Sequence, residues 1–307
     1  MKKVVLSQTI HPDGMAALAE APVHLVALQS DRPTSRETLA ANMADCDILI
    51  SMPGDCIDRA LIEAAPKLKL IAQHAVGYDN IDTDAAAERG IVVTNTPGAV
   101  TEATAEMTFA LMLAVARRIG EGETLLRNGL FFGWHPMQLL GIDLFGATLG
   151  IVGYGRIGRA VAQRAEAFGM KVVYHGRDNG MPLDALLGRS DIVSLHCPLN
   201  RETHHLMNRT RLAQMKQGAL LINTARGPII DESALVEALE QNHLGGVGLD
   251  VFEREPKVHP GLLNFRNVVA TPHQGTSTWG TRKRMASRVM DNVSAFLAGK
   301  KPPNQVV

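Results

Sequence analysis

The stretch that most constrains this chain is TLGIVGYGRIG at residues 148–158, where an apolar run breaks into Gly153, Gly155 and Gly158. The run predicts a buried strand that turns sharply into a helix, and a second strand at residues 171–175 completes a βαβ unit of about 30 residues. Gly153 would permit the tight turn, Gly155 would let phosphates approach the backbone, and Gly158 would let the helix pack closely on its strand. Glycines alone are weak evidence, but in this βαβ context they favour dinucleotide binding.

Composition narrows the classes of protein that remain. The 307 residues suffice for two domains, and 31 basic against 31 acidic residues give no bulk charge that would attract nucleic acid or an acidic membrane. Three scattered cysteines suggest neither a disulfide framework nor a metal site. The N-terminus turns polar too early for a signal peptide, and the longest apolar run, residues 109–116, is too short to span a membrane. We expect a cytoplasmic enzyme with no nucleic-acid partner, no membrane partner and no metal.

Short β-rich runs alternate with helical segments along the whole chain, and a final helix is predicted from about Thr276. The predicted strands lie at residues 4–6, 24–28, 47–50, 68–72 and 90–93, then around 149 and 172, and at 191–195, 219–222, 246–250 and 267–270. Strands that are apolar on both faces predict parallel sheets covered by helices on both sides. We therefore predict an α/β protein of two doubly wound parallel-sheet domains. A Rossmann dinucleotide-binding domain, residues 100–283, is inserted in a flavodoxin-like substrate-binding domain, residues 1–99 and 284–307.

Three ionisable residues follow late strands of the predicted nucleotide domain: Arg226, Glu255 and His273. Ligands bind at the carboxyl ends of strands in such sheets, so these side chains are expected at one crevice. A guanidinium can bind a carboxylate and an oxo group, an imidazole can supply a proton near neutral pH, and a carboxylate can orient that imidazole. Each residue alone is more often a solvated charge or a loop residue. Together they predict reduction of a 2-oxo acid by a nicotinamide cofactor.

Because of the glycine turn and the segments that carry Arg226, Glu255 and His273, the chain resembles the D-isomer-specific 2-hydroxyacid dehydrogenase family over essentially its whole length. The matching segments are the glycine turn, LHCPLN at 195–200 with Glu202 and Thr203, NTARG at 223–227, LDVFEREP at 249–256 and TPHQG at 271–275. The resemblance implies that Arg226 binds substrate, that His273 is the catalytic acid and base, and that Glu255 is its partner.

The glycine turn, the resemblance and the end of the second strand together predict which residues contact the cofactor. They are Gly153, Tyr154, Gly155, Arg156, Ile157, Gly158, His175, Gly176, Arg177, Cys197, Pro198, Thr203, Thr224, Ala225, Asp250 and Gly275. Asp250 would meet the nicotinamide amide, although an Asp at a strand end is equally a turn former. In the first domain, HAVGYDNID at 74–82 matches the loop whose backbone N–H groups bind the substrate carboxylate, so Val76 and Gly77 carry that role. Residues 76–119 are most similar to the glyoxylate, hydroxypyruvate and 2-ketogluconate reductase branch.

Two departures from the family pattern bear on function. NAD-dependent relatives have an Asp at the end of the second strand, where this chain has His175, Gly176 and Arg177. The missing carboxylate and the added cation predict that NADP(H) is preferred and that NAD(H) is possible, unless Arg177 only faces solvent. The second departure is Trp279 and Gly280 in place of a common acidic pair, which we expect to change local packing or an interface.

The leading hypothesis is therefore an NADPH-dependent reductase of glyoxylate, hydroxypyruvate or 2-ketogluconate that gives the D-2-hydroxy acid. A phosphoglycerate dehydrogenase-like enzyme and a non-catalytic cofactor-sensing binding protein are the alternatives. Phosphite is discounted as a substrate, because relatives that use it carry a lysine where Ala75 and Val76 stand. The family further implies a homodimer. Trp134 is either a dimer contact or a locally packed residue.

Overall fold

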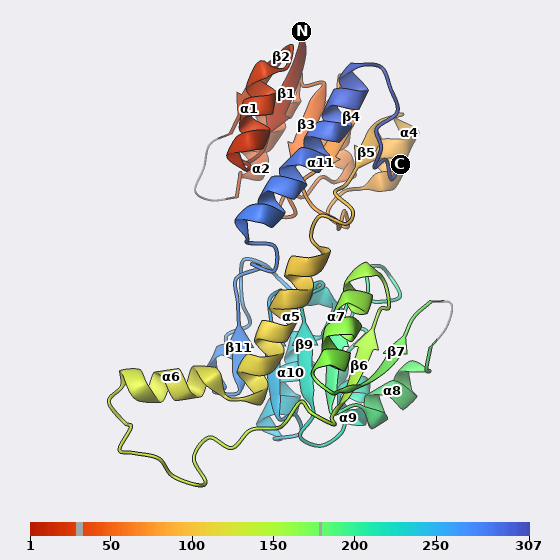
Figure 1. Ribbon diagram of the computed structural model, residues 1–307. Helices are drawn as coiled ribbons and strands as arrows, with labels where there is room; N and C mark the ends of the chain where they lie inside the picture. The colour runs from red at the N-terminus through yellow and green to blue at the C-terminus, as the bar shows by residue number, and fades with distance from the viewer. Residues whose placement is uncertain (29–32, 178–179) are drawn as a thin grey trace. The chain divides into compact units, whose positions relative to one another are not determined.

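The computed structural model describes residues 1–28, 33–177 and 180–307 and divides the chain into two compact units (Figure 1). Unit 1 comprises Met1–Val100 with Thr276–Val307, and unit 2 comprises Thr101–Gly275. The expected second boundary, between residues 283 and 284, falls inside helix α11 (Trp279–Leu297), and the whole helix belongs to unit 1. A continuous helix packs as one body, so the chain changes unit before the helix begins.

Unit 1 is built on a parallel five-stranded sheet in the order β2-β1-β3-β4-β5. Its strands are β1 (Lys2–Leu6), β2 (Val23–Ala27), β3 (Ile48–Ser51), β4 (Leu70–Gln73) and β5 (Val92–Thr94). Its helices are α1 (Pro12–Glu20), α2 (Arg36–Met43), α3 (Arg59–Glu63), α4 (Thr83–Glu88) and α11. Alternate strand residues face opposite cores: Val4 packs with α1 and α11, and Val5 packs with α2, α3 and α4. Burial on both faces explains the apolar runs that mark these strands.

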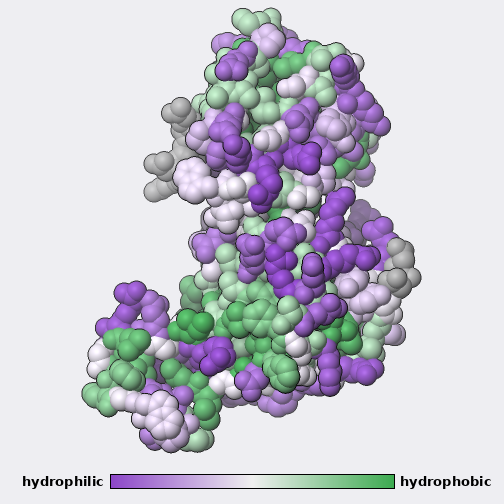
Figure 2. Space-filling view, in the orientation of Figure 1, coloured by the Kyte–Doolittle hydropathy of each residue, from purple (hydrophilic) through white to green (hydrophobic). Residues whose placement is uncertain are grey.

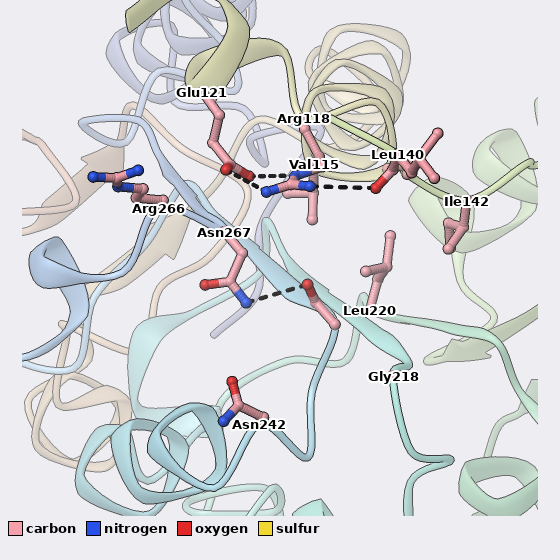
Figure 3. A pocket seen from close by; sticks show the side chains of 13 residues that line it. Val115, Arg118, Glu121, Leu140, Ile142, Gly218, Leu220, Asn242, Arg266 and Asn267 are labelled. Atoms are coloured by element: carbon pink, nitrogen blue, oxygen red, sulfur yellow. Dashed lines mark hydrogen bonds and ion pairs between the residues drawn. The ribbon is translucent and has the colours of Figure 1, made fainter. Parts of the chain in front are cut away.

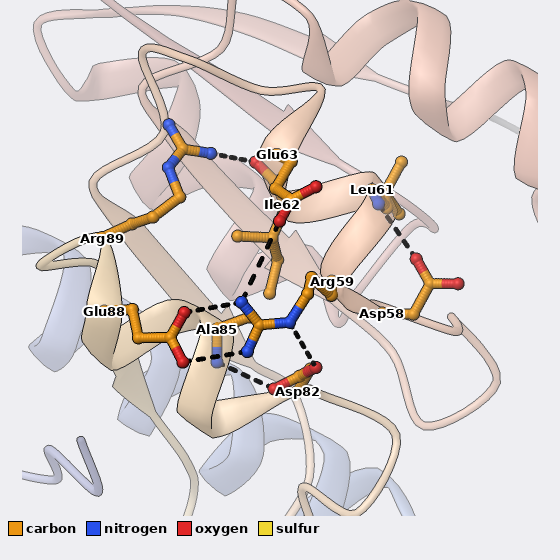
Figure 4. Close-up of polar contacts among 9 residues, drawn as sticks. All are labelled: Asp58, Arg59, Leu61, Ile62, Glu63, Asp82, Ala85, Glu88 and Arg89. Atoms are coloured by element: carbon orange, nitrogen blue, oxygen red, sulfur yellow. Dashed lines mark hydrogen bonds and ion pairs between the residues drawn. The ribbon is translucent and has the colours of Figure 1, made fainter.

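Helices α3 and α4 are joined on the surface by Arg59 (Figure 4). Its guanidinium donates two hydrogen bonds to the Glu88 carboxylate, of 2.6 and 3.0 Å, and lies 3.9 Å from Asp82. Asp58 and Asp82 cap the two helices through the Leu61 and Ala85 N–H groups. This cluster fixes the two short helices that follow β3 and β4.

Unit 2 is built on a parallel six-stranded sheet in the order β11-β10-β9-β8-β6-β7. Its strands are β6 (Thr148–Val152), β7 (Lys171–His175), β8 (Ile192–Leu195), β9 (Leu220–Asn223), β10 (Gly246–Leu249) and β11 (Val268–Ala270). Helices α5 (Thr101–Ala116) and α7 (Arg156–Ala167) cover one face. Helices α8 (Leu183–Arg189), α9 (Arg209–Gln214) and α10 (Glu232–Glu240) cover the other. Two 3-10 helices, Gly227–Ile229 and Leu262–Asn264, lie in its connections. The predicted α/β class and the two parallel sheets are confirmed.

Two features of the helices differ from expectation. The last helix begins at Trp279 rather than near Thr276, because the Thr278 hydroxyl caps it by accepting a 3.2 Å hydrogen bond from the Thr281 N–H. A separate helix, α6 (Ile119–Arg127), follows α5 and leads into an extended segment without helix or strand up to β6. None of the helices in the described ranges is long and apolar enough to cross a membrane.

Candidate active site

The glycine turn after β6 has the geometry that a dinucleotide pyrophosphate needs. Gly153 has a φ of 97°, and a Cβ there would lie 2.5 Å from the Cys197 nitrogen, so only glycine fits. A Cβ on Gly158 would lie 2.2 Å from the Gly153 carbonyl oxygen, so α7 lies directly against its strand. Gly155 faces open space, and no side chain caps α7 there. The first N–H groups of the helix are therefore available to phosphate oxygens, and the turn fits the cofactor.

The end of β7 presents the imidazole of His175 and the guanidinium of Arg177, and residues 175–177 include no carboxylate. The His175 Nδ1 lies 2.9 Å from the Met181 carbonyl oxygen. A carbonyl can only accept, so Nδ1 carries the proton and Nε2 is left for a ligand. Arg177 is exposed. Nearby, the Tyr154 ring stacks on Tyr174 with 3.9 Å between their centroids, which fixes the residue between Gly153 and Gly155.

The three predicted catalytic residues follow three neighbouring strands. Arg226 follows β9, Glu255 follows β10 and His273 follows β11, and β9, β10 and β11 are adjacent in the sheet. The structure brings two of them into direct contact, because the His273 Nδ1 lies 2.8 Å from a Glu255 carboxylate oxygen. The other Glu255 oxygen accepts a 3.0 Å hydrogen bond from the Phe252 N–H. The carboxylate is therefore held by its own segment while it binds the imidazole.

Charge around Glu255 keeps it ionised. Burial raises the pKa of Glu255, but the hydrogen bond and charge of His273, the Phe252 N–H and the charge of Arg226 outweigh burial and lower that pKa below its usual 4.5. Arg226 is thus near enough to act on the same carboxylate. Its own loop is fixed by Asn223, whose side-chain amide donates to the Arg226 carbonyl and accepts from the Ala225 N–H. A guanidinium, a carboxylate and an imidazole therefore meet at one edge of the sheet.

Asp250 positions His273, a role that the sequence did not show. Asp250 is buried, and its carboxylate accepts from the Thr271 hydroxyl at 2.7 Å and from the Gln274 and Gly275 N–H groups at 2.8 and 2.7 Å. The His273 N–H donates to the Asp250 carbonyl at 2.8 Å. His273 has a φ of 50°, a left-handed conformation that costs about 1–3 kcal/mol and persists only when neighbours impose it. These bonds make Asp250 a turn former, and its contact with the nicotinamide amide stays a prediction.

The remaining predicted cofactor residues surround the ends of β8 and β9. Burial raises the pKa of Cys197 to about 11, so its thiol stays protonated. The Thr203 hydroxyl donates to the Pro198 carbonyl at 2.6 Å and so closes the loop after β8. The Thr224 hydroxyl pairs with that of Thr108 at 2.9 Å. The structure thus assigns local bonds to these hydroxyls.

In unit 1, the Val76–Gly77 segment follows β4 and is fixed through its carbonyls. The Val76 oxygen accepts from the Asn95 amide at 2.9 Å, and the Gly77 oxygen accepts from the Gln73 amide at 3.2 Å. Across the residues that the structure describes, neither the Val76 nor the Gly77 N–H donates to an acceptor. Both residues are half-buried. This geometry suits the carboxylate-binding role that was predicted for them.

A pocket in unit 2 lies away from these residues (Figure 3). It has a volume of about 480 Å³ and is lined by residues that include Gly218, Asn267 and Leu140. Gly218 and Asn267 precede β9 and β11, so the pocket lies at the amino ends of the strands, opposite His273. Arg118 and Glu121 form an ion pair of 2.6 Å beside it. It contains none of the predicted site residues.

Fold and site together define an α/β enzyme that binds a dinucleotide and brings an imidazole and a carboxylate together beside it. The chain belongs to the D-isomer specific 2-hydroxyacid dehydrogenase family, whose NAD binding domain matches residues 109–275. The predicted family and the prediction of an enzyme are confirmed.

Relatives are similar over nearly the whole chain. A glyoxylate reductase of Korarchaeum cryptofilum is 45% identical, over 99% of this chain and 95% of the relative. The crystal structure of a protein from Thermus thermophilus has a TM-score of 0.94 and 47% identity, over 99% of this chain and 100% of that one. The structure of an NADPH-dependent glyoxylate/hydroxypyruvate reductase from Sinorhizobium meliloti, in complex with NADP and malonate, has a TM-score of 0.89 and 33% identity. The match covers 100% of this chain and 97% of that one.

Proposed function

We propose that this enzyme reduces small 2-oxo acids, such as glyoxylate, hydroxypyruvate or 2-ketogluconate, to D-2-hydroxy acids with NADPH. The observation that carries the proposal is the 2.8 Å contact of His273 with Glu255 beside Arg226, at the carboxyl edge of a dinucleotide-binding sheet. The glyoxylate reductases among its relatives support the substrate class.

The proposed mechanism assigns one task to each group. The Arg226 guanidinium and the Val76 and Gly77 N–H groups bind the substrate carboxylate and orient the oxo group. When bound, the reduced nicotinamide supplies a hydride to the oxo carbon. The Nδ1 of His273 remains bonded to Glu255, so its Nε2 donates the proton that the oxo oxygen gains. The hydride forms the new C–H bond, and the proton on the oxygen completes the hydroxyl group. Glu255 stabilises the imidazolium before this proton transfer.

The preference for NADPH rests on the end of β7. We infer that the guanidinium of Arg177, with His175 beside it, binds the 2′-phosphate, since residues 175–177 include no carboxylate to repel it. The NADP complex of the Sinorhizobium meliloti relative supports this choice of cofactor. Steady-state kinetics with both cofactors test it: equal or better use of NADH would contradict it.

Turnover tests the function itself. Purified protein is mixed with NADPH and each of the three 2-oxo acids, and loss of the reduced-nicotinamide absorbance is followed. The proposal requires turnover of at least one acid. Tight binding of NADPH without oxidation or reduction across a wider panel of 2-oxo acids would instead favour the cofactor-sensing protein.

We also propose that the enzyme is a homodimer formed through the arm, which we define as residues 119–145. Most exposed large apolar side chains of unit 2 lie on this arm, including Phe132 at 91% and Trp134 at 85% exposed. Apolar surface gathers over this segment in Figure 2. An apolar patch of this kind marks a protein interface, and 85% exposure leaves local packing unable to explain Trp134. Light scattering tests the proposal, and a monomer would refute it.

A further inference from the structure

A buried histidine follows β4 in unit 1 at the start of the proposed carboxylate loop. The His74 backbone is fixed by a 2.8 Å hydrogen bond from its N–H to the Ser51 carbonyl. Its side chain is 3% exposed, and its buried Nε2 has no hydrogen-bond partner among the described residues. Burial, and then the charge of Arg282, lower the pKa of His74 to about 4. The imidazole is therefore neutral near pH 7 and keeps a ring nitrogen unpaired.

Arg282 is the cation that acts on this histidine. It lies in the first turn of α11 and is half-buried. One of its N–H groups donates to the Ser277 hydroxyl at 3.2 Å, and burial lowers its pKa. Within the described parts of the chain, no carboxylate pairs with it, whereas the exposed Arg36 and Arg59 of the same unit bind Asp58 and Glu88. Arg282 is thus a partly desolvated charge that lacks a counter-ion among those residues.

His74 and Arg282 lie at the edge of the unit 1 sheet that is formed by the carboxyl ends of its strands. Helix α11 packs against β4, and its first turns meet the start of α1, where Lys283 pairs with Asp13 at 2.8 Å. In Figure 1 the first turn of α11 and the ends of the unit 1 strands lie at the same end of the unit. His74 is only two residues before Val76, a distance of at most about 7 Å along the chain. The imidazole therefore belongs to the segment that carries the N–H groups assigned to the substrate carboxylate, and the charge of Arg282 acts on that imidazole.

We propose that Arg282 and His74 form a second anion-binding subsite, and that its ligand is the distal carboxylate of a short dicarboxylic 2-oxo acid. An anion would neutralise the guanidinium and accept a hydrogen bond from the imidazole, whereas an apolar tail would leave both groups desolvated and unpaired. A cationic tail would be repelled by Arg282. The inference rests on the proposed function, because it places the reacting end of the substrate at Val76 and Gly77.

The kinetic test compares two substrates that differ only in the distal group. Oxaloacetate carries a second carboxylate where 2-oxobutyrate carries a methyl group. In Arg282→Gln, kcat/KM for oxaloacetate should fall at least about 10-fold, mainly through KM, while that for 2-oxobutyrate changes less than about threefold. Arg288→Gln, an exposed site on the same helix, is the matched control and should change neither value. An equal loss on both substrates would overturn the proposal.

A second pair of variants tests His74 and guards against misfolding. His74→Leu should reproduce the selective loss on oxaloacetate, and His74→Gln should restore part of it, because glutamine keeps a hydrogen-bonding group. Circular dichroism verifies the fold of each variant. If Arg282→Gln does not fold, the two His74 variants test the subsite on their own. A fall in kcat/KM for both substrates, or for neither, would overturn the proposal.

Binding of succinate, measured by calorimetry on the NADP-saturated enzyme, separates the subsite from the reaction. Wild type should bind succinate at least about 10-fold more tightly than Arg282→Gln, and Arg288→Gln should match wild type. Reduction of glyoxylate without an Arg282-dependent preference for diacids would refute the subsite and leave the proposed function standing. Arg282-dependent succinate binding without turnover of any 2-oxo acid would refute the function instead.

Discussion

Replacing Glu255 with glutamine probes the contact on which the proposed chemistry depends. The two Glu255 oxygens accept two hydrogen bonds, one from the Phe252 N–H and one from the His273 Nδ1. Glutamine has the same shape but one acceptor oxygen, so one of these donors must face an amide NH2 group. The substitution therefore removes a charge and a hydrogen bond with little change in volume.

The size of the effect follows from the geometry. A hydrogen bond to a charged group contributes about 1.5–3 kcal/mol. The side chains of His273 and Glu255 are 37% and 36% exposed, so solvent screening places the value near the lower part of that range, about 2 kcal/mol. Loss of about 2 kcal/mol in the transition state slows the chemical step about 30-fold.

Single-turnover stopped-flow oxidation of NADPH by glyoxylate measures this step directly. Glu255→Gln should be about 30-fold slower than wild type at pH 7, and Glu240→Gln, an exposed carboxylate on α10, should match wild type. The pKa of Glu255 is lowered, so its charge persists below pH 4.5 and is lost only as pH falls further. The ratio of the two rates should then shrink toward one. A rate within about twofold of wild type at pH 7 would show that the charge of Glu255 does not assist proton transfer from His273.

Other parts of the structure give further predictions. His273→Asn should abolish turnover while NADPH binding persists, because asparagine tolerates the left-handed backbone at this position; substantial residual rate would contradict the role of His273. Arg177→Ser should raise KM for NADPH about 10-fold with little effect on that for NADH, and equal changes in steady-state kinetics would exclude a 2′-phosphate contact. Phe132→Ser combined with Trp134→Ser should yield a monomer in light scattering, and an unchanged dimer would place the interface elsewhere. His74 must charge when the chain unfolds at low pH, so the free energy of unfolding should fall by about 3 kcal/mol between pH 6.5 and 4. His74→Leu should flatten that dependence in urea titrations, and an unchanged slope would show that other groups cause it.

The strands and the glycine turn could be predicted because their causes are local. A strand buried on both faces is an apolar run wherever it occurs. Gly153 has a positive φ that favours glycine, and Gly158 lies against the Gly153 carbonyl within the same βαβ unit. The order of Arg226, Glu255 and His273 after successive strands also lies in the sequence, since parallel strands place their carboxyl ends at one edge.

Features that depend on distant contacts could not be predicted. Asp250 binds Thr271, Gln274 and Gly275, which lie 21 to 25 residues later, and the left-handed backbone of His273 follows from those bonds. Nothing in the local sequence shows that Trp134 is exposed, because it lies in a segment without regular structure. The surroundings of Arg282 likewise become visible only when its neighbours from other segments are known.

In the proposed mechanism, hydride and proton are delivered to a 2-oxo acid in one fixed orientation. The most direct test is reduction of hydroxypyruvate with NADPH by wild type and His273→Asn, followed by chiral analysis of the glycerate formed. We predict that wild type gives D-glycerate alone and that the variant gives essentially none. Racemic or L-glycerate from wild type, or undiminished product from the variant, would contradict the proposed mechanism.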